Sequence, residues 1–548
     1  MSSARPVADS PAARFITTIR WADLPEAVTR RAALCLVDTV AAMLAGRAAP
    51  SARIAADLAG AWWGPGHAHL VLDGRRVAAP GAGFANAVAA NAVDIDDVGI
   101  YTWGHPGAQV VPAALALAEQ RHLDGRGLLT AIVVGYEMAF RAGRCVNFEA
   151  SKVAAAQRTY RACGSWGSVA CAAIASHVLG LDETATRHAL GIAEYHSPDL
   201  PLMRDLDAPA MVKHGVGPGV VTGLLAAELA SRGFTGITAS LDTERFRDFA
   251  GDLGTGYLLP EGISWKRFSS CAWTHPALIA AESLMARHAI APDRIANVLI
   301  ETYPDAVRLG TRLPATTEEA QFNLAWPVAA LLADGQVGPA QVLGGRLGSG
   351  VITELARRIE VRVSSELTRL YYLSEVNDPD GKDAAIVTIT FRDGTVLSSG
   401  LTENVLYPEP GWGEAEMGEK FKWLAAGHVK AAAINDLLSR LLDVASVPDV
   451  SALMDDFASS LLPALRGGER WATQRRSDRR RSRGGSCSPA RWRRPSAGWP
   501  AAAVPRRPAA AAAAAAAVRR HPPGPLAPRP PVPPARAARA ARRWPGSR

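Results

Sequence analysis

Several motifs that define large enzyme classes are missing from this sequence. It contains no Walker A loop, no Rossmann glycine fingerprint, no GxSxG nucleophile elbow and no HExxH helix. The spacing of its cysteines and histidines also fits no zinc site. These absences count against nucleotide hydrolysis, dinucleotide-dependent redox chemistry, serine hydrolysis and zinc-dependent proteolysis.

Cysteine is scarce, and its spacing indicates a reduced protein. There is no CxxC pair and no framework spacing, so we expect buried thiols rather than disulfides. No apolar run of about 18 residues is free of polar interruption, and the N-terminus lacks a basic-then-apolar signal pattern. We therefore expect a cytoplasmic protein with no membrane segment. The cysteines are Cys35, Cys145, Cys163, Cys171, Cys271 and Cys487.

Lysine, isoleucine, phenylalanine and tyrosine are absent from Arg466 onward, where the chain has 21 arginines, two acidic residues and abundant proline and alanine. The formal charge of +8 thus combines a tail of +19 with 465 preceding residues of −11. Such a tail cannot bury enough apolar area to offset its chain entropy, so we predict that residues 463–548 are disordered. The abrupt change is typical of a shifted reading frame in a GC-rich gene. An arm that binds nucleic acid or a membrane surface is the alternative, and we do not expect nucleic acid as a partner.

Apolar residues recur at helical spacing from about residue 12 to residue 270. Many of these stretches are apolar almost all round and rich in alanine, which indicates helices buried inside a large bundle. Gly46 suits the C-cap of the first long helix. The expected helices are Thr29–Met43, Phe84–Val93, Gln109–Gln120, Gly127–Arg144, Val169–Leu179, Thr184–Tyr195 and Val220–Ser231.

The pattern changes after about residue 290 to one that mixes strands with helices. Asp393-Gly394 between two alternating stretches is a strong hairpin signal. After Pro410 the helical pattern returns, so we expect the chain to re-enter the helical domain. The expected strands are Asn297–Glu301, Ile359–Val363, Ala385–Thr390 and Thr395–Ser399, and the expected helices are Ala277–Arg287, Glu318–Ala333, Glu419–Ala425 and His428–Leu442.

Together these patterns predict a protein that is mostly α with a smaller α+β domain. Residues 1–272 and 405–462 would form a large helical bundle domain that is discontinuous in sequence. Residues 273–404 would form an α+β lid domain.

Ionisable groups concentrate in one short segment, where Asp94-Ile-Asp96-Asp97 is followed by His105-Pro106. The flanking segments are nearly all Ala, Val and Leu, so these groups are costly to desolvate and point to acid–base chemistry. On a helix, Asp94 and Asp97 would share a face while Asp96 points elsewhere. Pro106 suits a first helical turn, which places His105 near an N-cap and favours its neutral form. The alternative is a capping histidine beside solvated aspartates.

Two basic clusters offer candidate anion-binding groups. Lys213 leads through a glycine-rich stretch into an apolar helix, a position that suits a carboxylate or a phosphate. Lys266 and Arg267 precede Cys271, and His275 opens the next helix. A basic pair at a domain edge that extends into solvent is the alternative explanation of the second cluster.

Arg161 stands immediately before another buried, alanine-rich helix. It is either a surface partner of that helix end or a clamp on a substrate carboxylate, for which the planar guanidinium is well suited. The aspartates of the Asp94 segment could hold a divalent cation, but no second acidic cluster is close in sequence, and we expect no metal.

Taken in order, these clusters resemble the MmgE/PrpD family over about residues 12–460. The family includes 2-methylcitrate dehydratase, cis-aconitate decarboxylase and iminodisuccinate epimerase. Each motif alone is modest, whereas the ordered set is specific. The matching elements are Asp94-x-Asp-Asp with His105-Pro-Gly-x-x-x-x-Pro-Ala-Ala, Gly135-Tyr-Glu, Lys213 ahead of Gly223-Leu-Leu-Ala-Ala, Arg232-Gly-Phe-Thr-Gly, Lys266-Arg-Phe, Thr274-His-Pro-Ala, Glu319-Ala-Gln-Phe and Lys420-Phe.

The resemblance implies a helical domain built from N- and C-terminal segments, a smaller α+β lid, a site in the cleft between them, and a homodimer. It also implies proton transfer next to the carboxylates of a small polycarboxylate substrate, without metal or cofactor. Asp94, His105, Lys213 and Lys266 match active-site positions of the family. His275 matches a position near the site.

The sequence also departs from the family pattern. Val98 stands where the decarboxylase-like pattern has a threonine, so a hydroxyl is missing. Arg161 and Cys271 stand where histidines are expected, and the spacing from Asp94 to His105 is one residue longer. These changes place a strict specificity for cis-aconitate or 2-methylcitrate in question.

We therefore expect a lyase of the hydro-lyase type that removes water from a small di- or tricarboxylate. One imidazole would exchange the proton, a carboxylate would orient or charge it, and cations would neutralise the substrate. A decarboxylase, an epimerase and a catalytically silent family member with a binding role are the alternatives. The predicted site comprises His105, Asp94 and Lys266 as catalytic residues and Lys213, Arg161, His275, Arg267 and Cys271 as substrate-binding residues.

Overall fold

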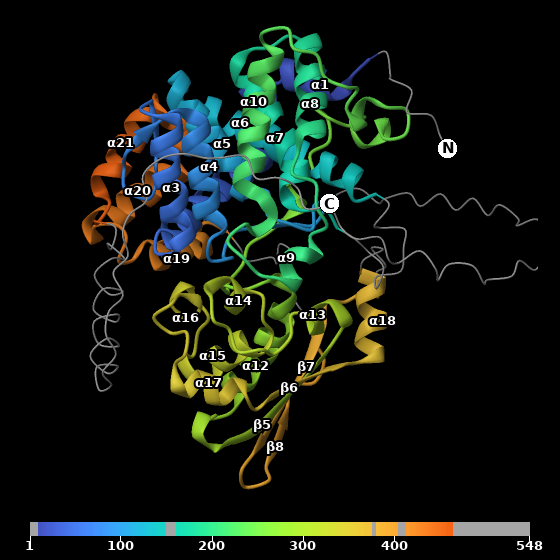
Figure 1. Cartoon of the computed structure of the whole chain (residues 1–548), viewed down its shortest axis with the longest axis vertical. Helices are drawn as coiled ribbons and strands as arrows, with labels where there is room; N and C mark the ends of the chain where they lie inside the picture. The colour runs from blue at the N-terminus through green and yellow to red at the C-terminus, as the bar shows by residue number, and fades with distance from the viewer. Residues whose placement is uncertain (1–8, 149–159, 375–379, 404–412, 464–548) are drawn as a thin grey trace, which may run out of the picture. The chain divides into compact units, whose positions relative to one another are not determined.

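The computed structural model describes residues 9–148, 160–374, 380–403 and 413–463 (Figure 1). These residues belong to one compact unit, which ends at Gly467. The tail predicted to be disordered lies outside the described residues except for Pro463. Within the described part no single helix has the length and apolar character needed to cross a membrane, and α2 with α3 passes only as a pair bent by 96°.

Helices make up the first half of the unit, as the apolar periodicity predicts. Every helix expected there is confirmed, with ends that differ by a few residues. The helices are α1 (Pro11–Thr18), α2 (Glu26–Gly46), α3 (Pro50–Trp63), α4 (Ala79–Asn91), α5 (Gly107–Arg121), α6 (Gly125–Val146), α7 (Cys163–Leu179), α8 (Glu183–His196), α9 (Met203–Asp207) and α10 (Val216–Ala230).

Small residues let these helices pack at close range. Helix α7 has a fully buried run of alanines and glycines, and α10 packs along it. A Cβ atom added to Gly223 of α10 would lie 2.4 Å from the carbonyl oxygen of Ser168 in α7. The two backbones are therefore nearly in contact, which explains why both helices are apolar on most sides.

The C-terminal helices return to the N-terminal bundle, as predicted. Helices α19 (Glu414–Ala425) and α20 (Ile434–Leu442) pack against α2, and α21 (Val450–Ser460) packs against α5. Figure 1 shows them in orange beside the blue helices α3 and α4. Arg47 fixes this return, because its guanidinium donates hydrogen bonds of 2.8 Å to the carbonyl oxygens of His428 and Leu462.

A mixed sheet forms the centre of the α+β part. Its strand order is β6-β5-β7-β8, with β5 and β6 parallel, the other neighbours antiparallel, and β9 paired with β7. The predicted hairpin at Asp393-Gly394 joins β7 to β8, and Gly394 supplies the positive φ of 88° that the turn needs. The strands are β5 (Ile295–Thr302), β6 (Ile359–Val363), β7 (Ala384–Phe391), β8 (Val396–Ser398) and β9 (Thr402–Glu403).

Helices cover this sheet and join it to the bundle. Helix α12 packs on β7 and on α15, and the buried side chains of β5 and β7 share one apolar core with them. Arg308 in α13 pairs with Asp207 in α9 at 2.6 Å. The helices of this part are α12 (His275–Arg287), α13 (Pro304–Arg308), α14 (Thr317–Gln321), α15 (Ala325–Asp334), α16 (Pro339–Val342), α17 (Gly350–Ala356) and α18 (Ser365–Ser374), whereas the short α11 (Leu259–Gly262) packs against α2 and α6 of the bundle.

One expected helix, Glu318–Ala333, is wrong because the chain breaks it into α14 and α15. The side chain of Asn323 accepts a hydrogen bond of 2.7 Å from the backbone N–H of Trp326, which starts a new helix. Pro327 then lies in the first turn of α15, where its missing N–H costs nothing. The expected helix His428–Leu442 likewise begins late, because residues 431–433 form a single tight turn before α20.

The fold class is thus confirmed as mostly α with a smaller α+β part. The domain boundaries at residues 272/273 and 404/405 stay predictions, since the described residues form a single compact unit. Short strand pairs complete the structure: β1 (Ala68–His69) with β2 (Arg76–Val77), and β3 (Val98–Gly99) with β4 (Ile263–Ser264).

Candidate active site

The segment that carries the three aspartates is buried but not helical. Helix α4 ends at Asn91, and Asp94 has a positive φ of 56°, which is uncommon for a residue other than glycine. The expectation that Asp94 and Asp97 share a helix face is therefore wrong. Each carboxylate instead meets different partners, and the alternative of solvated loop aspartates is also excluded because all three are at most 1% exposed.

Asp94 lies between two lysines. Its Oδ1 is 3.0 Å from Nζ of Lys266 and 3.7 Å from Nζ of Lys213. Burial alone would raise the pKa of Asp94, but Lys266, Lys213 and the nearby imidazoles lower it well below its usual range. Neither carboxylate oxygen of Asp94 accepts a hydrogen bond from the described residues. Asp94 is therefore an ionised, sparsely hydrogen-bonded carboxylate at the centre of the cluster.

His105 stands beside Asp94, as predicted, and its orientation is set by the other side of its ring. Its Nδ1 lies 2.9 Å from the carbonyl oxygen of Asp97 and 3.1 Å from Oδ2 of Asp96. A carbonyl oxygen only accepts, so Nδ1 carries a proton there. Nε2 is then directed to Oδ1 of Asp94, 3.4 Å away. Asp96 is a site residue that the sequence reasoning did not single out.

The side chain of Asp97 makes its contacts away from the imidazole, near the carboxylate of Asp38. Its Oδ1 accepts a hydrogen bond of 2.9 Å from the N–H of Gly107 at the start of α5, and its Oδ2 accepts one of 2.6 Å from the hydroxyl of Tyr136. Burial and the nearby Asp38 raise the pKa of Asp97 to about 8. Lys420 in α19 pairs with Asp38 at 2.5 Å and donates to the carbonyl oxygen of Ile95 at 2.9 Å.

Lys266 and Lys213 both donate hydrogen bonds to backbone carbonyl oxygens of residues 91–94. Lys266, which is fully buried, donates to the carbonyl oxygens of Asp94 at 3.0 Å and Ser270 at 3.2 Å. Lys213 donates to the carbonyl oxygen of Asn91 at 2.5 Å and to Oε1 of Gln321 in α14 at 2.6 Å. Gln321 lies in the quoted motif Glu319-Ala-Gln-Phe, yet sequence reasoning did not name it as a site residue.

His214 is the most prominent residue that the sequence prediction missed. Its ring stacks on that of His105, with centroids 5.2 Å apart and planes 17° apart. Its Nδ1 lies 3.2 Å from Oδ2 of Asp205 in α9, and its backbone N–H donates to the same oxygen at 2.5 Å. The only local signal was its position next to Lys213.

Cys271 and His275 lie at the edge of the cluster on the side of Lys266. Burial and the nearby Asp94 raise the pKa of the Cys271 thiol to about 12, so it is a neutral group where the family pattern has a histidine. Burial, together with Lys266, lowers the pKa of His275 to about 3. The ring of His275 meets the edge of Phe268 at 5.2 Å, and its Nε2 has no hydrogen-bond partner among the described residues.

The two predicted arginines have their charges directed elsewhere. Arg161 pairs with Asp199, and its guanidinium also donates to the carbonyl oxygen of Asp199 at 2.8 Å. Arg267 pairs with Glu282 at 2.8 Å and lies over the ring of Phe268. No contact in the described part of the chain joins either guanidinium to Asp94 or His105, so their roles in substrate binding stay predictions.

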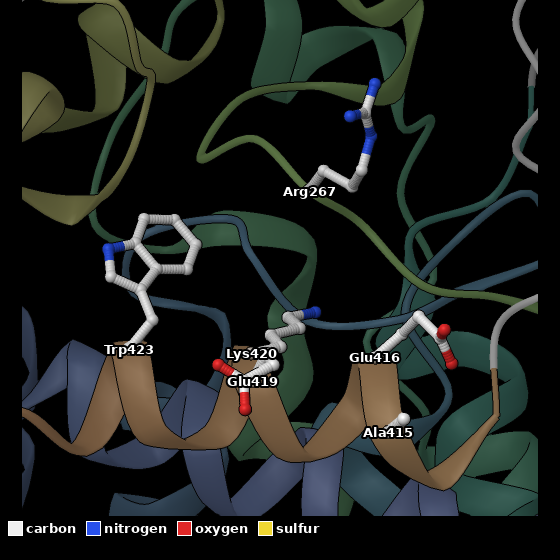
Figure 2. Close-up of a pocket in the computed structure, with 6 residues that line it drawn as sticks. All are labelled: Arg267, Ala415, Glu416, Glu419, Lys420 and Trp423. Atoms are coloured by element: carbon white, nitrogen blue, oxygen red, sulfur yellow. The ribbon is translucent and has the colours of Figure 1, made fainter.

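Arg267 instead lines a pocket of about 500 Å³ beside α19, together with Ala415, Glu416, Glu419, Lys420 and Trp423. Figure 2 shows Trp423, Lys420 and Glu416 rising from one side of α19, with Arg267 across the space on a separate loop. Two of its lining residues connect to the site residues or their segment. Arg267 follows Lys266 in sequence, and Lys420 contacts Ile95.

Asp94, His105 and His214 are close enough to suggest a metal centre, because one ligand atom from each lies within 4.8 Å of the others. The ammonium groups of Lys266 and Lys213 already neutralise Asp94, however, and would repel a divalent cation at this distance. The cluster is better suited to transferring protons and to binding an anion.

Comparison with known proteins places the chain in a family. The MmgE/PrpD N-terminal domain matches residues 11–249, and the MmgE/PrpD C-terminal domain matches residues 268–443. The cis-aconitate decarboxylase-like protein oryM of Aspergillus oryzae is 25% identical over 483 residues, which cover 80% of this chain and 95% of that protein. Human cis-aconitate decarboxylase is 24% identical over 68% of this chain and 78% of its own length. Cis-aconitate decarboxylase of Aspergillus terreus is 23% identical over 82% and 97%, respectively. The chain belongs to the MmgE/PrpD family.

Proposed function

We propose that this protein is a cofactor-independent lyase that removes water from a small di- or tricarboxylate of the 2-methylcitrate type. The observation that carries the proposal is the buried imidazole of His105, which lies between Asp96 and Asp94, with Lys266 and Lys213 beside the same Asp94 oxygen that His105 faces. We also propose that it works as a cytoplasmic homodimer with this acid as its small-molecule partner.

The charges of the cluster support a carboxylate substrate. Two buried ammonium groups are costly to desolvate unless anions balance them. In the free protein Asp94 and carbonyl oxygens do so, and a substrate carboxylate would compete for the same lysines. Removal of a proton next to that carboxylate builds negative charge on its oxygens, which fixed ammonium groups stabilise in a site of low dielectric.

The proton chemistry falls to His105. Its Nδ1–H is held by Asp96 and the Asp97 carbonyl, so Nε2 is the atom that faces the cluster. Asp94, next to Nε2, stabilises the charged imidazolium once a proton is bound. His105 thus transfers the proton between enzyme and substrate, and Asp94 orients and charges it.

Decarboxylation is the second candidate, and the relatives favour it. Three of the similar proteins carry the name cis-aconitate decarboxylase or decarboxylase-like. Loss of CO2 followed by delivery of a proton to carbon would use the same histidine. Val98, Arg161 and Cys271 differ from the family pattern, which leaves room for an acid other than cis-aconitate.

Incubating the full-length protein with 2-methylcitrate, citrate and cis-aconitate tests the proposal. Formation of an unsaturated acid, release of CO2 and uptake of solvent deuterium are followed together. We expect an unsaturated acid from 2-methylcitrate or citrate, and we expect replacement of His105 by Ala to abolish it, by at least about 100-fold. Replacement of the exposed His67 by Ala serves as the control. Full activity of the His105 variant would overturn the assignment, and CO2 release alone would select the decarboxylase.

A further inference from the structure

Two histidine–aspartate pairs face one another across the candidate site. His105 is held by Asp96 and His214 by Asp205, in each case with Nδ1 3.1 to 3.2 Å from a carboxylate oxygen. The two rings stack, and one ring nitrogen of each lies within 4.8 Å of the other and of a carboxylate oxygen of Asp94. The proposed function uses only the first pair, so the second is unexplained.

His214 has a left-handed backbone conformation, which residues other than glycine rarely adopt. His214 has a φ of 57° and a ψ of 0°, and Gly215 after it also has a positive φ. Such a conformation is unfavourable for a residue other than glycine, so the surrounding contacts must enforce it. Asp94 and His214 are two of the four non-glycine residues with positive φ in the described part of the chain, and both belong to this site.

The two imidazoles differ in the charges that face them. His105 has carboxylates at both ring nitrogens, Asp96 at Nδ1 and Asp94 at Nε2. His214 has Asp205 at Nδ1, the ring edge of Phe322 at 5.6 Å, and the charges of Lys213 and His105 nearby. Burial, with His105 and Lys213, lowers the pKa of His214 despite Asp205. His214 is therefore suited to accept a proton and His105 to donate one.

We propose that His214, held by Asp205, is a second proton-transfer group that removes the carbon-bound proton while His105 protonates the departing hydroxyl. The base takes the proton from the carbon next to a substrate carboxylate, and the electron pair of that C–H bond becomes the C=C double bond. The C–O bond on the neighbouring carbon breaks, and its electron pair leaves with the hydroxyl group as water, using the proton of His105. Return of one proton from His214 to His105 through solvent completes the cycle. This inference rests on the proposed lyase function and specifies it.

The second group also separates the two candidate reactions. Elimination of water needs a base at one carbon and an acid at the neighbouring oxygen, whereas decarboxylation needs one proton donor at carbon. Two ring nitrogens within 4.8 Å of each other can serve the two ends of one C–C bond. Asp205 would be a positioning residue, since its Oδ2 lies 3.2 Å from Nδ1 of His214 and stabilises the charged form of the ring.

The test uses full-length His214→Asn, because asparagine tolerates the left-handed backbone but cannot act as a base. The matched control is His122→Asn, which replaces another histidine of positive φ, 52°, at the exposed end of α5. With 2-methylcitrate as substrate, we expect kcat of His214→Asn to fall at least about 100-fold with KM within threefold, and deuterium exchange at carbon to stop. His122→Asn should keep the wild-type kcat. Asp205→Asn should lose about tenfold in kcat.

A second measurement reads His214 without turnover. Long-range ¹H–¹⁵N spectra of the histidine-labelled full-length protein, compared with those of His214→Asn, identify its ring signals. We expect a neutral ring at pH 7 that is protonated at Nδ1 alone, and loss of that preference in Asp205→Asn. A doubly protonated His214 in the free protein would overturn this inference and leave the proposed lyase function standing. A His214→Asn variant that keeps more than a third of the wild-type kcat would do the same. Failure of the wild-type protein to turn over any acid would overturn the proposed function and this inference with it.

Discussion

Two buried histidines of the helical bundle, His69 and His105, both face carboxylates, yet their surroundings differ. His69 lies in the regular strand pair β1–β2, pairs with Glu119 through Nδ1, and accepts a hydrogen bond of 3.1 Å from Arg76 at Nε2. Glu119 also accepts a hydrogen bond of 3.1 Å from the backbone N–H of His69. Each polar atom of this ring therefore has a partner, and its backbone is unstrained.

The cluster around His105 has the opposite character. The Asp94 oxygens accept no hydrogen bond from the described residues, although two lysines form ion pairs with this carboxylate. In addition, Asp94 and His214 both have positive φ angles. A buried histidine–carboxylate pair is thus not by itself a site. Unsatisfied groups together with backbone strain distinguish a site that awaits a ligand from a pair that joins strands and helices.

Replacing Lys266 by Met would break the comparison most strongly. The change leaves the buried Asp94 with Lys213 as its remaining ammonium partner, so we expect a loss of about 3 kcal/mol in the free energy of unfolding and of at least about 100-fold in turnover. Urea unfolding and initial rates with an acid that the wild-type protein converts measure the two effects. Lys430→Met, at an exposed lysine, should change neither. Unchanged turnover in the Lys266 variant would contradict the assigned role.

Replacing His69 by Ala should separate stability from activity. The variant leaves Glu119 buried without its ring partner, so we expect the unfolding free energy to fall by about 2 kcal/mol. The kcat of the folded fraction should match the wild-type value, since the pair lies outside the site. Denaturant titration and rates normalised to folded protein check this, and a tenfold fall in kcat would remove the distinction between the two histidines.

The pH dependence of stability should reveal the protonation state of Asp97. Because burial and Asp38 raise the pKa of Asp97 to about 8, the folded protein holds a proton there that the unfolded chain, with a pKa of about 3.9, has released. This contribution to stability is complete below the unfolded pKa and is lost as the pH rises toward 8. Asp97→Asn stays neutral, so its unfolding free energy relative to wild type should increase between pH 5 and pH 8. A difference that is constant with pH would show that Asp97 is ionised.

The smallest effect is expected at Arg267. Its guanidinium is about half exposed and pairs with Glu282 on the surface, so Arg267→Gln should cost about 0.5 kcal/mol of unfolding free energy and leave turnover within threefold. Rates and denaturant midpoints of Arg267→Gln and Glu282→Gln should agree. A tenfold rise in KM for the Arg267 variant alone would instead support the sequence prediction that Arg267 binds substrate.

Local sequence patterns recovered the helices well and the broken helix poorly. The alanine-rich periodicity of Val220–Ser231 is a property of neighbouring residues, and α10 follows it closely. The break between α14 and α15 depends on the side chain of Asn323, which accepts from the N–H of Trp326 and donates to the carbonyl oxygen of Arg312, so it could not be predicted from periodicity. The same applies to the segment after α4, where a helical spacing of aspartates did not produce a helix.

For the site, the sequence identified the chemistry but not all of its members. Asp94, His105, Lys213 and Lys266 were named and lie together. Asp96 and His214 were missed because their roles depend on ring orientation and on a stack between segments distant in the chain. Arg161 was named, but Asp199 holds its charge, and nothing local predicts that pairing.

The sequence by itself determined that ionisable groups would be buried here. It places them between helices that are apolar on most sides. A buried charge needs a partner because the loss of its hydration is unfavourable unless an opposite charge or a hydrogen bond replaces the water. Only the tertiary structure decided which partner each group has. Lys266 reaches Asp94 because β4, just before it, pairs with β3 in the segment after α4. His214 reaches His105 because α10, which follows His214, packs against α4 and α5. Distances of 3 to 4 Å between atoms far apart in the chain follow from packing and from no local rule, and these distances turn three common residue types into a candidate proton-transfer site.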